Sequence, residues 1–179
     1  ARVRAIAEGG SPEAVSTLAV TLAAKLPTDA AGTEWVVERL VERGPTFQTI
    51  ELVLGLGLEK DRLEAVLTEL LAKGDEWPWR ALAGEPELAR SLALSTLRTA
   101  EDGAARIAES VLARCGPRTE EEVRLLLRAI ERGPTTELLA ALAEAPQLSD
   151  SLRNAVAAAL SPSDGEQAEA AVDCLWRHR

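Results

Sequence analysis

The residue types that build nucleophilic catalytic systems are scarce in this sequence. Its single histidine, His178, is next to the last residue, and its two cysteines, Cys115 and Cys174, are far apart. A Ser-His-Asp or Cys-His system would have to use that one imidazole on a segment prone to fraying. The sequence has no phosphate-binding loop ending in Lys-Ser or Lys-Thr, no Gly-x-Ser-x-Gly elbow and no His-Glu-x-x-His helix. The scarcity of these residues and the missing motifs disfavour an enzyme, and the sequence predicts no catalytic residue.

Metal ligation is equally poorly supported. Cys174 and His178 are four residues apart and would share a helix face, with Cys115 conceivable as a third zinc ligand, but structural zinc needs four ligands. The acidic run 120–122 points in three directions on a helix, and its place in a first turn is explained by the helix dipole. We therefore expect no metal and no cofactor.

One segment has a composition that helix formation does not explain. Trp77, Trp79 and Arg80 surround Pro78, and Trp and Arg are enriched at interaction hot spots. We predict these three residues as a partner-binding site. The alternative is that both Trp rings fill a gap between helix layers at a corner. Three other aromatic residues are predicted to be core or near-core: Trp35, Phe47 and Trp176.

The charge balance argues against phosphate-rich partners. The chain has 20 basic and 29 acidic residues and a net charge of −9, which on average repels nucleic acids and anionic membranes. Its arginines are dispersed among acids, so nucleic-acid binding is the third-ranked interpretation. No apolar run approaches the roughly 20 residues of a membrane-spanning helix. Two distant cysteines without a signal-like segment predict a reducing, cytoplasmic location.

The composition and the spacing of apolar residues both favour helix. Apolar residues make up 46% of the chain and are largely Ala, Leu and Val, while Tyr and Met are absent. Leucine and valine recur at helical spacing in about ten segments, separated by Gly-Pro, Thr and Ser-Pro corners. Thr46 is predicted to cap the helix that begins at Phe47. Thr119 with Glu122 is predicted to form a capping box.

The corners hint at internal repetition. Residues 42–46 read Glu-Arg-Gly-Pro-Thr and recur letter for letter at 131–135, with Cys-Gly-Pro at 115–117 as a degenerate copy. Short Leu/Val/Ala helices ending at Gly or Pro resemble HEAT-like repeats as a class. The fold predicted is all-α, with about ten short antiparallel helices in a HEAT-like α-solenoid, or alternatively a compact irregular bundle. Residues 1–179 are expected to form one all-helical domain, a fragment of a longer protein.

These observations rank three functions. The first is a non-catalytic interaction or scaffold module that binds a protein, a peptide or other domains of its own chain. The second is a helical-bundle enzyme or small-molecule-binding domain, which an enclosed pocket of converging charges would favour. The third is a HEAT-like nucleic-acid-binding domain, which would need arginines gathered on one concave face.

Overall fold

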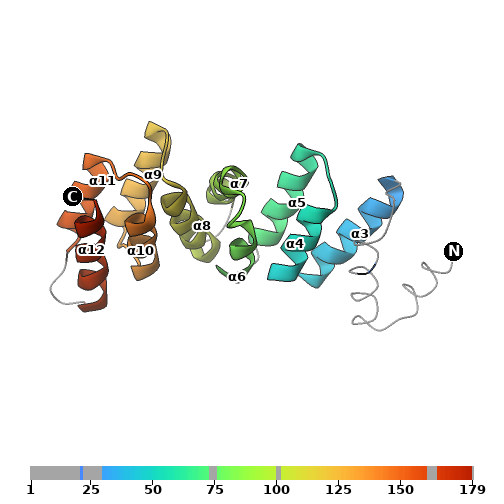
Figure 1. Cartoon of the computed structure of the whole chain (residues 1–179), viewed down its shortest axis with the longest axis horizontal. Coiled ribbons are helices and arrows are strands. Elements are labelled where there is room, and N and C mark those ends of the chain that lie inside the picture. Colours follow the sequence, from blue (N-terminus) through green and yellow to red (C-terminus); the bar gives the residue numbers. More distant parts are fainter. Residues whose placement is uncertain (1–20, 22–29, 73–75, 100–101, 161–164, 179) are drawn as a thin grey trace. The chain divides into compact units, whose positions relative to one another are not determined.

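A computed structural model describes residue 21 and residues 30–72, 76–99, 102–160 and 165–178 (Figure 1). These ranges contain helices and connecting loops and no strand, so the predicted all-α class is confirmed for them. The Ser11-Pro12-Glu13 segment predicts a further helix, which lies outside the described residues. The elements are α3 (Ala30–Arg43), α4 (Phe47–Gly55), α5 (Lys60–Ala72), α6 (Glu76–Trp79), η1 (Arg80–Leu82), α7 (Pro86–Thr99), α8 (Asp102–Cys115), α9 (Glu120–Glu131), α10 (Thr136–Glu144), α11 (Asp150–Ala158) and α12 (Gly165–Arg177).

The chain divides into two compact units, Ala1–Gly84 and Glu85–Arg179. In unit 1, α3 contacts α4 and α5, and α4 also contacts α5, α6 and η1. Fully buried leucines and isoleucine, among them Leu40, Ile50 and Leu67, fill its core. Each such side chain contributes about 1.5–3 kcal/mol when it leaves water. The guanidinium of Arg62 in α5 donates to both oxygens of the Glu34 carboxylate in α3, at 2.7 and 2.9 Å, which joins the amino-terminal halves of these two helices.

Unit 2 combines contacts between consecutive helices with contacts between helices that are separated by one other helix in the chain. α10 packs against both α8 and α12, α9 packs against α11, and α7 packs on α8 (Figure 1). Buried alanines occupy much of the α8–α10–α12 layer, and small side chains let helix axes approach closely. They are Ala108, Ala113, Ala141, Ala143 and Ala171.

Polar contacts fix the direction of α12 against α10. The Gln167 amide in the first turns of α12 donates to the Pro134 carbonyl just before α10, at 2.9 Å. At the other end, His178 Nε2 lies 2.8 Å from the Leu142 carbonyl in the last turn of α10. The two helices therefore run parallel. In the last turns of α8 and α10, Arg114 and Glu144 form an ion pair at 2.8 Å.

The predicted corners have the expected chemistry. Gly44, Gly116 and Gly133 end α3, α8 and α9 with φ of +90°, +75° and +115°, a region that residues with a Cβ rarely adopt. After each corner a threonine side chain accepts from a first-turn amide of the next helix, as at Thr46 and Thr135. Thr119 and Glu122 form the predicted capping box. One helix boundary differs from the sequence pattern. Thr33-Glu34 is typical of a helix start, but α3 begins three residues earlier, at Ala30.

Two aromatic predictions were wrong. Phe47 is 40% exposed and Trp176 is 60% exposed, so neither is a core residue. Each lies on a helix whose buried face is supplied by other residues, such as Ile50 in α4 and Cys174 in α12. None of the described helices combines the length and the apolar character needed to cross a membrane.

Candidate functional site

The predicted binding segment spans α6 and η1, which pack on α4 in unit 1. Pro78 is buried and the Trp79 ring is only 5% exposed. Its indole N–H has no hydrogen-bond partner among the described residues. Arg80 is exposed, and the side chain of Trp77 lies outside the described residues. Trp79 and Arg80 therefore do not form one surface, and a partner could reach Arg80 but not the Trp79 ring without rearrangement.

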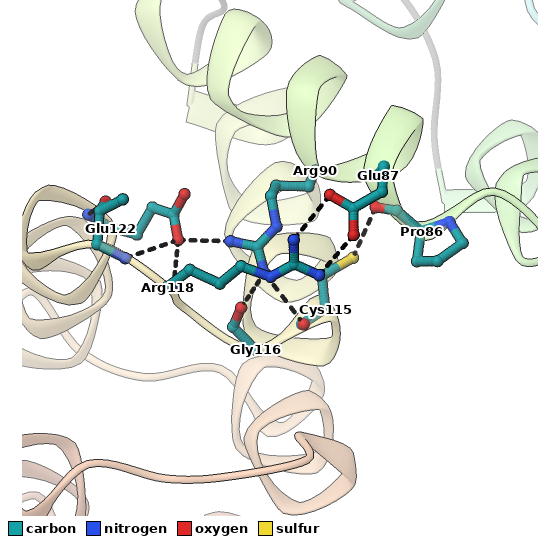
Figure 2. Close-up of polar contacts among 8 residues, drawn as sticks. Pro86, Glu87, Arg90, Cys115, Gly116, Arg118 and Glu122 are labelled. Atoms are coloured by element: carbon teal, nitrogen blue, oxygen red, sulfur yellow. Dashed lines mark hydrogen bonds and ion pairs between the residues drawn. The ribbon is translucent and has the colours of Figure 1, made fainter.

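The densest polar arrangement lies instead where α7, the end of α8 and the start of α9 meet (Figure 2). At its centre, Arg90 in α7 and Glu122 in α9 are only 7% and 5% exposed. Arg90 Nη1 donates to Glu122 Oε2 at 2.6 Å. Arg90 Nη2 donates to the carbonyls of Cys115, at 3.2 Å, and of Gly116. One guanidinium thus holds the carboxyl end of α8 and the amino end of α9 together.

Glu122 has a second role in the same place. Its carboxylate accepts from the backbone N–H groups of Arg118 and, at 3.3 Å, Thr119, which closes the capping box. Burial opposes ionisation of this carboxyl, but the backbone and guanidinium hydrogen bonds outweigh burial and hold the pKa of Glu122 below its ordinary value. Glu122 is therefore a carboxylate at neutral pH, matched by Arg90.

A second ion pair covers this centre on its solvent side. Arg118 grips the Glu87 carboxylate with both terminal nitrogens, one of them at 2.8 Å (Figure 2). Beside it, the Cys115 thiol donates to the Pro86 carbonyl at 3.6 Å. Burial raises the pKa of the Cys115 thiol, against an opposing effect of Arg90, so the reactive thiolate is disfavoured. The arrangement holds three helices together and presents no activated nucleophile.

The other candidate ligands are also engaged in packing. Cys174 is fully buried, and burial raises the pKa of its thiol to about 11. His178 points its Nε2 at a backbone carbonyl of α10. In the acidic run, Glu122 turns inward whereas Glu120 pairs outward with Arg124 at 3.0 Å. Across the described residues, no group of three or more His, Cys, Asp or Glu could hold a metal ion.

Ion pairing neutralises many of the arginines on the surface. Arg62, Arg114 and Arg132 each bind a glutamate that lies 23 to 30 residues away in the chain, and Arg39 and Arg177 bind acids one turn away. Two exposed apolar residues lie one turn apart on α12: Val172 is 56% exposed and Trp176 is 60% exposed. They are the most exposed large apolar side chains of unit 2 that the structure describes.

Sequence reasoning did not find the Arg90–Glu122 pair. One signal was present: Arg90 lies between Ala89 and Leu92 on the apolar face of its helix, where a cation requires a partner. The sequence did not identify Glu122 as that partner. The pairing depends on how α9, which carries Glu122 32 residues further along the chain, packs on α7.

The comparisons with known proteins give no family to which these features could be assigned. The sequence matches no protein-family model, and neither a curated protein nor a solved structure is detectably similar to it.

Proposed function

We propose that this chain is a non-catalytic helical-repeat scaffold, HEAT-like in the way its helices stack, that binds a protein, a peptide or other domains of its own chain in a reducing, cytoplasmic setting. The observation that carries the proposal is the next-but-one packing within each unit, α3 on α5 in unit 1 and α8 on α10 on α12 in unit 2. Stacked repeats produce this pattern, because each new pair of helices packs on the preceding pair.

The long-range polar contacts support the same arrangement. Glu34–Arg62, Arg114–Glu144 and Gln167–Pro134 join residues 28, 30 and 33 positions apart. Such spacings are close to the length of one helix pair, so each contact joins similar positions in successive pairs. Neutralised arginines also favour a protein or peptide partner over nucleic acid, which needs unpaired cations facing its phosphates.

Solution scattering tests the stacked arrangement. A compact domain of this length would have a radius of gyration of about 16 Å. An extended stack predicts a clearly larger value and an asymmetric distance distribution. A value of about 16 Å would instead favour the compact bundle and, with it, the enzyme or small-molecule alternative.

A binding experiment tests the role of the predicted segment. The exposed Arg80 is replaced by Glu, and the matched control is Arg98→Glu, an equal charge change at an exposed position of α7. Quantitative capture from a lysate of the source cells should recover a defined protein with wild type and with Arg98→Glu, but less of it with Arg80→Glu. Equal recovery of the partner with both variants would show that Arg80 is not part of the binding site.

Trp79 is unsuitable as a binding probe because it is buried. Trp79→Ala should destabilise unit 1 by about 3–5 kcal/mol, the usual cost of deleting a core aromatic ring. Thermal unfolding measures this cost, and an unchanged transition would show that the ring is not part of the core.

A further inference from the structure

The five residues Glu-Arg-Gly-Pro-Thr form a helix corner twice in this chain, at 42–46 in unit 1 and at 131–135 in unit 2. In each copy the glycine has a positive φ, and the threonine caps a nine-residue helix, α4 or α10. The third, fourth and seventh residues of both helices are buried: Thr49, Ile50 and Val53 in α4, and Leu138, Leu139 and Leu142 in α10. The two corners can therefore be compared position by position.

The arginine of this motif binds a carboxylate in one copy and not in the other. In unit 2, Arg132 Nη2 donates to both oxygens of Glu109, at 2.7 and 2.9 Å, and the Glu109 side chain is only 9% exposed. In unit 1 the equivalent Arg43 is exposed, and no ion pair or hydrogen bond of its guanidinium is found among the described residues. The adjacent Glu42 is bound by Arg39, at 2.6 Å. Arg43 is therefore a cation whose counterpart in unit 2 holds a carboxylate.

The residue after the motif also differs between the two corners. In the described part of unit 1, Phe47 is the most exposed large apolar residue, at 40%, whereas its counterpart Thr136 in unit 2 is half-buried. Aromatic residues and arginine are the types enriched in protein interfaces, and here both lie within one corner. Glu51, one turn further along α4 and also exposed, would repel an acidic ligand that lay along this helix. An acidic ligand would therefore lie across the corner.

We propose that the corner formed by Arg43 and Phe47 is a docking site for an acidic peptide segment of a partner protein. A Glu or Asp side chain of the peptide binds the Arg43 guanidinium, as Glu109 binds Arg132, and a neighbouring apolar side chain covers the Phe47 ring. The site rests on the proposed scaffold function, names the chemistry of the partner and does not depend on Arg80. An exposed ion pair contributes little by itself, so both contacts are needed and the complex weakens with salt.

Selection from a display library of short random peptides, with the full chain as the target, tests the class of ligand. We expect the enriched peptides to share an acidic residue beside an apolar one. A synthetic peptide of the enriched sequence is then titrated with the full chain by fluorescence anisotropy. The same peptide with its acidic residue changed to the corresponding amide is the control ligand and should bind more weakly. A selection that enriches no peptide, or only peptides without an acidic residue, would overturn the proposal.

Variants of the chain locate the binding of the selected peptide. Arg43→Glu should weaken it about ten-fold or more, because hydrogen bonds between charged groups are lost. Arg43→Lys should restore only part of the affinity, since Lys keeps the charge but not the planar fork. Phe47→Thr, which gives unit 1 the residue of the second corner, should also weaken binding. The matched control is Arg128→Glu, which changes another exposed arginine in the last turn of a helix and should leave the affinity unchanged.

Thermal unfolding distinguishes a carboxylate of a partner from a carboxylate of this chain. Arg43→Glu and Arg128→Glu each remove a cation from the last turn of a helix and should lower the melting temperature by similar, small amounts. A larger fall for Arg43→Glu would show that the chain already supplies the carboxylate, which would overturn the proposal. Selected peptides that bind both variants equally would also overturn this site. They would leave the scaffold function standing, since scattering and capture at Arg80 test that function.

Discussion

The corner between α8 and α9 and the corner between α9 and α10 have similar backbones but different long-range anchors. Both have a positive-φ glycine followed by proline, and both end in a threonine cap. The first is held by the buried Arg90 guanidinium and the Glu122 carboxylate. The second is held by a neutral hydrogen bond from Gln167 to the Pro134 carbonyl, and by an ion pair of the exposed Arg132 with the Glu109 carboxylate in α8, at 2.7 and 2.9 Å. Local sequence thus specifies the turn, while residues about 30 positions away determine how firmly the turn is attached to its neighbours.

The largest effect should come from breaking the charged anchor. Arg90→Met leaves Glu122 buried without its cation, and removing one member of a buried pair costs about 3–5 kcal/mol. Urea unfolding should show this loss, and Arg118→Met, which removes only the exposed pair with Glu87, should cost a small fraction of it. The double variant Arg90→Met/Glu122→Leu should cost less than the two single changes added together, since no unpaired charge remains. Equal losses for Arg90→Met and Arg118→Met would contradict a central role for Arg90.

The second effect concerns pH. Because the folded pKa of Glu122 lies below the ordinary 4.5, its ionisation contributes stability that is present above about pH 4.5 and is lost as the pH falls through the folded pKa. Glu122→Gln should cost about 1.5–3 kcal/mol near neutrality, the range for hydrogen bonds to a charged group. The difference in stability between wild type and Glu122→Gln should become smaller as the pH falls. Thermal melts from pH 7 to pH 3 measure it, with the exposed Glu121→Gln as the control; a gap independent of pH would refute the assignment.

The same two corners show how far the sequence could predict the structure. Gly116, Thr119 and Glu122 were predicted to form a helix stop and a capping box, because these motifs depend on residues within one turn of each other. The helix stop predicted at Gly133 was also right, whereas the cap at Thr135 had not been predicted. The anchors could not be predicted in the same way. Whether Arg90 or Gln167 reaches a given corner depends on helix packing that local periodicity does not encode.

The candidate site shows the same limit. The motif of Trp77, Trp79 and Arg80 identified an unusual composition, but composition does not say which ring faces the core. Burial of Trp79 depends on α6 and η1 docking on α4, a tertiary contact. Conversely, Trp176 was expected in the core on hydrophobicity alone, yet Cys174 and Ala171 occupy the buried face of α12.

A third, smaller effect should distinguish the glycines of the two corners. Gly116→Ala and Gly133→Ala both place a Cβ at positive φ, at a cost of about 1–2 kcal/mol. Only at Gly116 does the new Cβ also meet another residue, Pro146 Cδ at 3.1 Å. Introducing Pro146→Ala should therefore recover part of the loss in Gly116→Ala and none in Gly133→Ala. Chemical unfolding of the four variants measures this, and equal recovery at both corners would show that Pro146 acts through some other contact.

The smallest effect should come from the neutral anchor. Gln167→Ala removes one hydrogen bond to the buried Pro134 carbonyl and should cost about 0.5–1.5 kcal/mol. Because His178 still ties the other end of α12 to Leu142, the loss should appear as faster amide exchange in the first turns of α12 and not along the whole helix. Glu166→Ala, one residue away and exposed, is the control. A loss for Gln167→Ala as large as that for Arg90→Met would mean that this neutral hydrogen bond holds its corner as firmly as the buried ion pair holds the other, and it would contradict the comparison.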